Sequence, residues 1–450
     1  MTNDTAGRAL YERYGGICRK NDYIAPRLYE EYGVNKGLRD EKGRGVLAGL
    51  TGISEVNSHK VVNGVNSPCE GELWYRGYLI EDLISMIGNA PGFEKIAYLL
   101  LMGEMPSDEE CAEFSRLIGE YRTLPSNFTR DVIMKAPSAD IMNSMTRSIL
   151  TLASYDESPS DTSVENVLRQ CVRLIAEFPL LAVYGYHAFN YSENGDSMII
   201  HRPDPTLSTA ENILLMLRPD KTYTRTEAKV LDTALILHME HGGGNNSTFT
   251  TRVVTSSGSD TYSTIAAAMS SLKGPKHGGA NIKVMEMMAD IREHVKDHSD
   301  RDEVASYLEK IIEKRAFDGK GLIYGMGHAV YSLSDPRERI FKKYVERLAA
   351  EKDREGDLAL YQAVEDLAPR MISKSRRIFK GVSPNVDFYS GFVYDMLGIP
   401  IELYTAMFAT ARIVGWSAHR IEELICMDKI IRPAYMSVMT KVERDRTGTP

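Results

Sequence analysis

The residues best suited to chemistry in this chain are histidines framed by glycine and an aspartate among apolar neighbours. His277 lies in the glycine-rich stretch 274–281, and His328 directly follows a Gly-Met-Gly turn, so a ligand can approach the backbone at both places. Asp387 lies between a valine and a phenylalanine. Partial burial there would raise the pKa of the carboxyl group and make it a stronger base.

The surroundings of His277 predict its protonation state. A run of small residues at 263–271 is stopped by Gly274 and Pro275, and a new helix is expected near Asn281. His277 would then lie just before a helix N-terminus, where the dipole disfavours an imidazolium. We therefore expect a neutral ring that can donate a hydrogen bond to a carbonyl.

A second pair of histidines, His238 and His241, is spaced to share one face of a helix that Gly242–Gly244 ends. The negative end of the helix dipole predicts charged forms for both rings. The alternative, above all for His238, is that these histidines only place positive charge in the last turn of the helix and have no role in a site. A metal site is weakly indicated, because no matching cysteine or acidic residue is near.

Two arginines lie where a cation is unfavourable without an anion. Asp335, Pro336 and Glu338 predict a helix start with an N-cap, a first-turn proline and a capping-box acid. This places Arg337 in the first turn, where the dipole favours anions instead. Arg412 is surrounded by an apolar helical stretch. Its guanidinium needs an anion, either a protein carboxylate in an internal salt bridge or a substrate.

The elements that must position these residues are predicted to be helices. Ser107–Glu110 and Thr224–Glu227 match capping boxes, and residues 303–317 and 336–350 have helical spacing. The best strand candidates lie within residues 52–75. The fold class is therefore expected to be all-α.

Composition excludes several classes of protein. Hydrophobic residues make up 43% and charged residues 26% of the 450 residues, and the net charge is -8, which argues against nucleic-acid and anionic-membrane partners. No apolar run is long enough for a membrane span, and no secretory signal is expected. The five cysteines form no CxxC pair and predict reduced thiols in the cytoplasm.

Charge is concentrated at about 296–380, between two more apolar blocks, which predicts a smaller inserted subdomain. Residues 1–45 are charged and aromatic and are expected to form a peripheral arm. The histidines, the aspartate and the arginines together suit proton abstraction next to a carbonyl, on a dianionic partner.

At this point the ordered motifs resemble the citrate synthase family, including the 2-methylcitrate synthases. The resemblance rests on Gly274-Pro-Lys-His277-Gly-Gly-Ala-Asn281, Asn385-Val-Asp387-Phe-Tyr-Ser-Gly391, Gly327-His328-Ala-Val-Tyr331, Asp335-Pro-Arg337, Ala411-Arg412 and Arg432-Pro433. It implies an all-α, two-domain homodimer. Residues 46–281 and 396–450 would form the large helical domain, and residues 282–395 the small domain on the acyl-CoA side.

The resemblance also implies roles for individual residues. Asp387 would remove a proton from the acyl-CoA, neutral His277 would stabilise the enol, and His328 would polarise the 2-oxo group. The oxaloacetate carboxylates would be held by His241, Arg337 and Arg412, and by Arg432 reaching in from the partner subunit. His238 is a weaker candidate for the same role. No metal or organic cofactor is implied, and the expected partners are oxaloacetate and acyl-CoA.

Several alternatives stay open. Lys374, Arg376 and Lys380 belong to a basic cluster that would meet CoA phosphates or form an ordinary solvated face. Propionyl-CoA could replace acetyl-CoA, because one methylene is worth only about 1 to 3 kcal/mol in a pocket. The rivals from other classes are a helical protein that binds dicarboxylates or CoA without turnover, and a histidine-based metalloenzyme.

Overall fold

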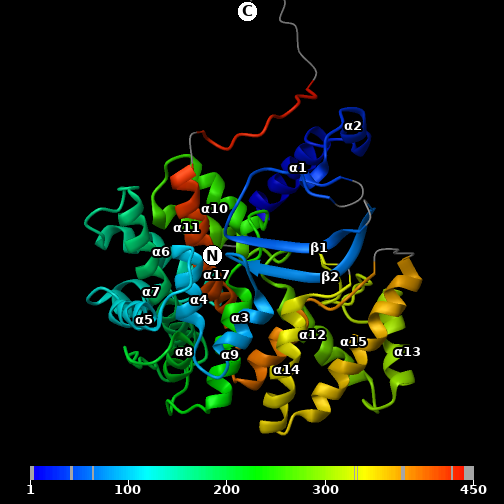
Figure 1. The fold of residues 1–450 in the computed structure, drawn as a ribbon. Coiled ribbons are helices and arrows are strands. Elements are labelled where there is room, and N and C mark those ends of the chain that lie inside the picture. Colours follow the sequence, from blue (N-terminus) through cyan, green and yellow to red (C-terminus); the bar gives the residue numbers. More distant parts are fainter. Residues whose placement is uncertain are drawn as a thin grey trace, which may run out of the picture. The chain divides into compact units, whose positions relative to one another are not determined.

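The computed structural model describes residues 5–40, 44–62, 65–328, 330–331, 333–376, 381–426 and 429–439. It is predominantly helical (Figure 1), which confirms the predicted class. The helices are α1 (Thr5–Asn21), α2 (Pro26–Glu31), α3 (Ile80–Ile87), α4 (Phe93–Met102), α5 (Asp108–Tyr121), α6 (Ile141–Leu152), α7 (Val164–Glu193), α8 (Thr209–Leu217), α9 (Arg225–His238), α10 (Asn246–Ser256), α11 (Thr261–Leu272), α12 (Ala280–His294), α13 (Arg301–Ile312), α14 (Pro336–Glu351), α15 (Glu355–Arg376), α16 (Val386–Met396) and α17 (Tyr404–Cys426), with short turns at η1 (Lys36–Leu38), η2 (Thr129–Ile133), η3 (Ala153–Tyr155) and η4 (Ile401–Leu403).

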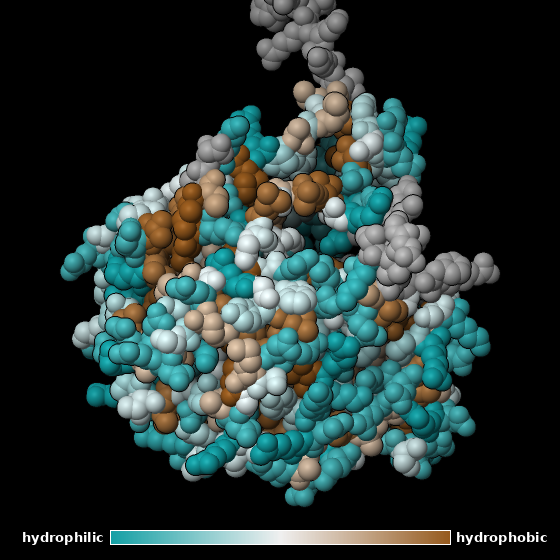
Figure 2. Space-filling model, in the orientation of Figure 1, coloured by the Kyte–Doolittle hydropathy of each residue, from teal (hydrophilic) through white to brown (hydrophobic). Residues whose placement is uncertain are grey.

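The chain divides into two compact units. One consists of residues 50–431 and contains the helices from α3 to α17; the other consists of residues 1–49 and 432–450 and contains α1 and α2. In the second unit α1 has exposed apolar side chains such as Tyr11 and Ile17. None of the described helices combines the length and the apolarity that crossing a lipid bilayer requires. The face drawn in Figure 2 is mostly hydrophilic, with hydrophobic residues in small groups.

Local capping explains where many helices begin. The predicted capping boxes form: Ser107 with Glu110 at α5, and Thr224 with Glu227 at α9. Asp335 caps α14 as predicted, by accepting a hydrogen bond from the backbone N–H of Arg337. The predicted capping role of Glu338 is wrong, since its side chain is buried and its Oε1 has no hydrogen-bond partner among the described residues.

One predicted helix is shifted. α13 begins earlier than residue 303, because Asp300 caps it with hydrogen bonds to two backbone N–H groups. It ends at Ile312 and not near residue 317, since Lys314 and Phe317 adopt positive φ angles of 64° and 55° that a helix does not tolerate.

The core of the larger unit is built around α17. Residues Tyr404 to Ile421 of this helix are all buried, and it packs against α7, α10, α9 and α4. The segment from α12 to α16 makes a neighbouring group, in which α16 packs on α12 and α14, and α13 on α15. In Figure 1 these elements run from green-yellow to orange. α14 also contacts α9, so the two groups of helices meet there.

A three-stranded antiparallel sheet provides the β structure expected within residues 52–75. Its strands are β1 (Ser54–Val62), β2 (Val65–Tyr75) and the short β3 (Tyr78–Leu79), in the order β1-β2-β3. β2 runs against the loop before α14: a Cβ atom on Gly71 would lie 2.3 Å from the carbonyl oxygen of Ser334 and 2.6 Å from Cδ1 of Tyr331. Glycine is therefore required at this contact.

Candidate active site

His328 and Asp387 are held by two paired loops. Segments 325–327 and 383–385 lie antiparallel and exchange backbone hydrogen bonds of 2.7 and 2.9 Å. Asn385 ties them further, because its Nδ2 donates to a carbonyl of the first segment at 2.8 Å and its Oδ1 caps α16 by accepting from the N–H of Asp387 at 3.0 Å. The two side chains therefore share one local framework.

The carboxyl group of Asp387 is a poised base. The side chain keeps part of its surface exposed, but the protein around the carboxyl raises its pKa to about 6 by desolvation. Arg337 and Arg412 partly oppose this rise. The predicted shift of Asp387 is confirmed, and the group is mostly ionised at neutral pH yet less solvated than an ordinary carboxylate.

His328 carries its proton on the nitrogen away from the backbone. Its Nδ1 accepts hydrogen bonds from the N–H groups of Val330 and Tyr331 at 3.0 and 3.1 Å. In the neutral ring the proton is then on Nε2, which can donate. The ring stacks on that of Tyr331 with centroids 4.8 Å apart and meets the edge of His241 at 5.0 Å.

His277 is neutral, as predicted, but chiefly for another reason than the helix dipole. Burial, and to a smaller extent the nearby Arg412, lowers the pKa of His277 to about 4. Its Nε2 lies 3.0 Å from Oγ of Ser247, which also accepts a hydrogen bond from Nε1 of Trp416 at 3.1 Å. Ser247 on α10 thus links the ring of His277 to Trp416 on α17.

The prediction of charged His238 and His241 is wrong. Burial lowers the pKa of His238 to about 3 and that of His241 well below its usual value, and Arg337 and Arg412 add to both effects. Desolvation and cations outweigh the helix end, which contributes only about 0.3 to 1 kcal/mol. α9 also ends at His238, so His241 lies beyond the helix.

His238 contacts Arg412 through its backbone carbonyl, while its ring packs among aromatic side chains. Its Nδ1 interacts with the carbonyl oxygen of Ala234 at 2.8 Å, and its ring lies edge-on to Phe341 and Phe408. The carbonyl of His238 accepts a hydrogen bond of 2.7 Å from Nε of Arg412. Nε2 of this ring is buried without a hydrogen-bond partner among the described residues, so the substrate contact of His238 stays a prediction.

Arg412 is fully buried and forms no direct ion pair with any described carboxylate, although the charge of Glu240 favours its ionised form at longer range. Its Nη1 has no hydrogen-bond partner there, and its guanidinium lies 4.7 Å from the ring centre of Phe408. Burial lowers the pKa of Arg412 to about 10, which still leaves it charged at neutral pH. A buried cation of this kind is suited to bind an anion.

Arg337 is paired, which sequence reasoning missed. Asp335 accepts from Nε and Nη2 of Arg337 at 3.0 and 2.7 Å, and from the backbone N–H of Val386 at 3.3 Å. Burial alone would raise the pKa of Asp335, but Arg337 holds it below its usual value. The carboxylate explains why a cation is tolerated in this first turn, and it joins α14 to the start of α16.

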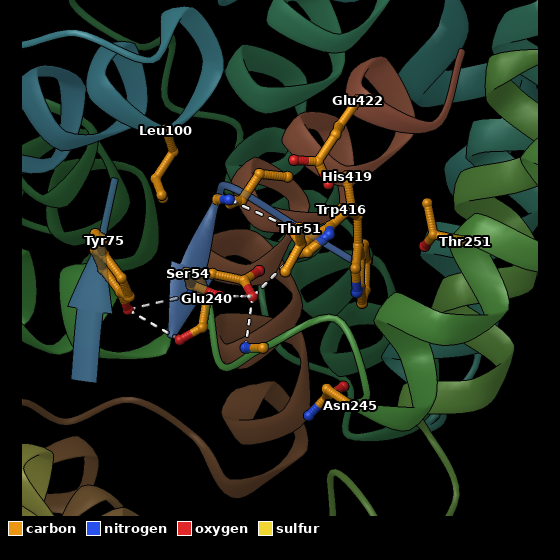
Figure 3. Close-up of polar contacts among 12 residues, drawn as sticks. Thr51, Ser54, Tyr75, Leu100, Glu240, Asn245, Thr251, Trp416, His419 and Glu422 are labelled. Carbon is orange, nitrogen blue, oxygen red and sulfur yellow. Dashed lines mark hydrogen bonds and ion pairs between the residues drawn. The ribbon is translucent and has the colours of Figure 1, made fainter. Parts of the chain in front are cut away.

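Glu240 is a second acid that the sequence reading passed over, although it lies between the two histidines of 238–241. Figure 3 shows it beside Ser54 and below His419. Its Oε1 accepts from Oγ of Ser54 at 2.9 Å, Nε2 of His419 at 3.0 Å and the N–H of Gly242 at 2.6 Å. Burial raises its pKa, but His419 and Arg412 outweigh that and hold it at about 2. It is therefore a buried counter-charge for the pocket.

For the other predicted site residues, a place at this pocket stays a prediction. Lys374 is exposed near the end of α15, the side chain of Arg376 and all of Lys380 lie outside the described residues, and Arg432 is exposed in the unit of residues 1–49 and 432–450. Among the described residues no three His, Cys, Asp or Glu side chains gather as a metal ion would require.

The pocket therefore gathers one base, neutral histidines and two arginines from distant parts of the sequence. Arg412 interacts electrostatically with His277, His241 and Asp387, which places all of them in one field. This set can remove a proton next to a carbonyl, stabilise the oxygen that gains charge, and hold a second, anionic reactant.

Comparison with known proteins agrees with this chemistry. Residues 37–434 match the family model of the citrate synthase C-terminal domain. The chain is 32% identical to 2-methylcitrate synthase 2 of Corynebacterium glutamicum, covering 89% of this chain and 93% of that one, and 33% identical to citrate synthase of Synechocystis sp., covering 87% and 90%.

A solved structure has the same fold. It is citrate synthase of Thermoplasma acidophilum in a ternary complex with carboxymethyl coenzyme A and oxaloacetate, with a TM-score of 0.74 and 28% identity over 92% of this chain and 98% of that one. The chain belongs to the citrate synthase family of acyltransferases.

Proposed function

We propose that this enzyme condenses acetyl-CoA with oxaloacetate and hydrolyses the resulting thioester, giving citrate and free CoA. The observation that carries the proposal is the desolvated carboxyl of Asp387, with a pKa of about 6, in one electrostatic field with neutral His277 and two buried arginines. The ternary complex of the Thermoplasma acidophilum relative supports these substrate classes.

The first step is enolisation. Asp387 takes a proton from the methyl carbon of the thioester, and the electron pair of that C–H bond moves to form the enol. His277 donates a hydrogen bond to the thioester oxygen, which gains the negative charge. Because its pKa is about 4, the ring of His277 is neutral at physiological pH, and it donates a hydrogen bond without carrying a positive charge.

The second step is carbon–carbon bond formation. The enol carbon attacks the 2-oxo carbon of oxaloacetate, and the oxygen of that carbonyl is polarised by the Nε2–H of His328. Arg412, Arg337 and His241 hold the carboxylates, with Arg432 supplied by the partner subunit of a homodimer. Fixing the dianion in this way makes the attack effectively intramolecular. Water then hydrolyses the thioester and drives the reaction forward.

The division into a large domain (46–281 and 396–450) and a small domain (282–395) is part of this proposal. His277 is tied to α17, since Oγ1 of Thr405 donates to the carbonyl of Gly278 at 3.1 Å. His328 and Asp387 are tied to each other within the small domain. Closure of one domain on the other would complete the site and exclude water until the condensation is over.

The chemistry requires no metal or organic cofactor, because side chains supply the base and the hydrogen-bond donors. The basic cluster around Lys374, Arg376 and Lys380 is proposed to meet the CoA phosphates. A cytoplasmic location is supported by the five cysteines, all of which are free thiols.

Propionyl-CoA is the second candidate acyl donor. The citrate synthase and 2-methylcitrate synthase relatives are 33% and 32% identical to this chain, so neither is favoured by similarity. A single methylene changes binding by only about 1 to 3 kcal/mol, or roughly 10- to 200-fold in kcat/KM.

The decisive experiment measures oxaloacetate-dependent release of free thiol from acetyl-CoA and from propionyl-CoA, with the Asp387→Asn variant as the control. Higher kcat/KM with acetyl-CoA supports the proposal, and higher kcat/KM with propionyl-CoA replaces it with 2-methylcitrate synthesis. If well-folded protein binds oxaloacetate but releases no thiol from either donor, the catalytic proposal fails and a binding role takes its place.

A further inference from the structure

Tyr331 belongs to the motif that carries His328, but the mechanism gives it no task. Its side chain is only 2% exposed. It touches three groups of the pocket at once: its ring stacks on His328, meets His241 edge-on at 5.5 Å, and lies 5.9 Å from the guanidinium of Arg337. Such a central place suggests more than core packing.

The hydroxyl group of Tyr331 is the polar contact of this ring with the pocket. It lies 3.3 Å from Nε2 of His241 and 3.5 Å from the carbonyl oxygen of Glu72 on β2. If it donates to Glu72, it accepts from His241; if it donates to His241, that nitrogen is the acceptor. In both arrangements the imidazole of His241 is oriented by one phenolic oxygen.

The ring of Tyr331 in turn packs against β2. A Cβ on Gly71 would lie 2.6 Å from its Cδ1, so the strand and the ring are in closest contact here. The N–H of Gly71 also donates to Oγ of Ser334 at 3.2 Å, three residues after Tyr331. The sheet is therefore built against the loop that carries His328.

We propose that Tyr331 is a positioning residue that packs against β2. Its hydroxyl orients His241 for substrate binding, and its ring holds His328 in place for catalysis. This inference rests on the proposed function, because it assigns the two histidines to binding and to carbonyl polarisation. It predicts that the hydroxyl and the ring can be separated by substitution.

Tyr331→Phe removes the hydroxyl and keeps the stack. We expect the KM and the Kd for oxaloacetate to rise about three- to tenfold, as for the loss of one hydrogen bond, with kcat changed less than twofold. Tyr331→Leu removes the stack as well. We expect kcat to fall at least tenfold in addition, since the ring of His328 is then free to turn.

Gly71→Ala tests the strand from the other side. The added methyl group must push the ring of Tyr331 or the loop at Ser334 away, because both lie within 2.6 Å of it. We expect the same rise in KM and fall in kcat as for Tyr331→Leu, although Gly71 takes no part in the chemistry.

Matched controls separate positioning from stability. Tyr184→Phe removes another buried tyrosine hydroxyl, which donates to the carbonyl of His201 at 2.8 Å, and Gly356→Ala adds a methyl group where no atom lies within 4 Å. Both are expected to leave KM and kcat unchanged.

The readouts are steady-state kinetics and calorimetric binding of oxaloacetate without acyl-CoA. Unchanged KM and Kd in Tyr331→Phe, or equal losses in Tyr184→Phe, would overturn the inference while leaving the proposed function intact. If wild-type protein binds oxaloacetate without turnover, the proposed function fails, and the Kd of Tyr331→Phe still decides whether the hydroxyl orients His241.

Discussion

Arg412 and Arg420 lie eight residues apart on α17, and both side chains are fully buried, but the regions around them differ. Arg420 donates four hydrogen bonds of 2.8 to 3.2 Å, to the hydroxyls of Thr255, Thr261 and Thr264 and to the carbonyl of Ser259. Among the described residues Arg412 donates a single hydrogen bond, to the carbonyl of His238, and its Nη1 has no partner there.

The comparison shows how the same residue type serves two purposes in one helix. A buried guanidinium with its N–H groups satisfied by neutral oxygens is part of the scaffold. One that leaves donors free, next to a desolvated carboxyl such as Asp387, costs stability and is retained for binding or catalysis. The predictions below test this contrast.

The largest effect is expected at Asp387. Asp387→Asn removes the base but keeps the shape of the side chain, so kcat should fall at least a hundredfold, while oxaloacetate still binds. Thiol release and calorimetry measure the two quantities. Turnover close to that of wild type would remove Asp387 from the base role and leave the free donors of Arg412 without a catalytic partner.

The two arginines should respond in opposite ways. Arg412→Leu is expected to raise the KM for oxaloacetate by about a hundredfold, as for the loss of about 3 kcal/mol of charge-assisted bonding, without lowering the thermal midpoint. Arg420→Leu is expected to cost about 2 to 4 kcal/mol of unfolding free energy, because buried oxygens lose their donor, and to leave KM unchanged. The contrast would be broken if Arg412→Leu left KM unchanged.

The pH dependence gives a smaller, graded effect. The carboxyl of Asp387 must be ionised to act, and its pKa is about 6, so kcat/KM should fall as pH drops through 6 and reach about a tenth by pH 5. His277, with a pKa of about 4, stays neutral over that range. Rates measured from pH 5 to 8 check this; a kcat/KM that stays unchanged down to pH 5 would contradict the desolvation of Asp387.

The smallest effect is on stability. The pKa of Asp387 in the folded state lies above its usual 3.8, so folding favours the protonated carboxyl group. This contribution to the free energy of unfolding is fully present below about pH 4 and is lost as the pH rises through 6. Asp387→Asn avoids the cost of the buried charge and should be about 1 to 3 kcal/mol more stable than wild type at pH 8, with no gain at pH 4. Denaturant unfolding at both pH values measures this difference.

Much of the fold could be predicted because its signals are local. The capping boxes at Ser107 and Thr224 and the N-cap at Asp335 each depend on side chains within three residues. The identity of Asp387, His277 and His328 as candidates likewise came from their immediate neighbours and from the family resemblance.

What could not be predicted depends on distant contacts. The protonation of His238 and His241 was misjudged because the local dipole was visible and the burial was not. The packing of Tyr331 against β2 brings together residues about 260 positions apart, and no local sequence pattern indicates this contact. The Asp335 pair of Arg337 is the exception, since an acid two residues away could have been considered.

The pairing of segments 325–327 and 383–385 has a consequence for any motion of the enzyme. Because these loops are hydrogen-bonded to each other, His328 and Asp387 are expected to move as one unit. The hydrogen bond from Thr405 to the loop of His277 likewise links that histidine to α17, the helix of Arg412. The proposed closure of the two domains would then change mainly the distance between the His328–Asp387 pair and His277. Redesign of the acyl pocket would therefore succeed more readily by exchanging both paired loops at once than by altering either alone.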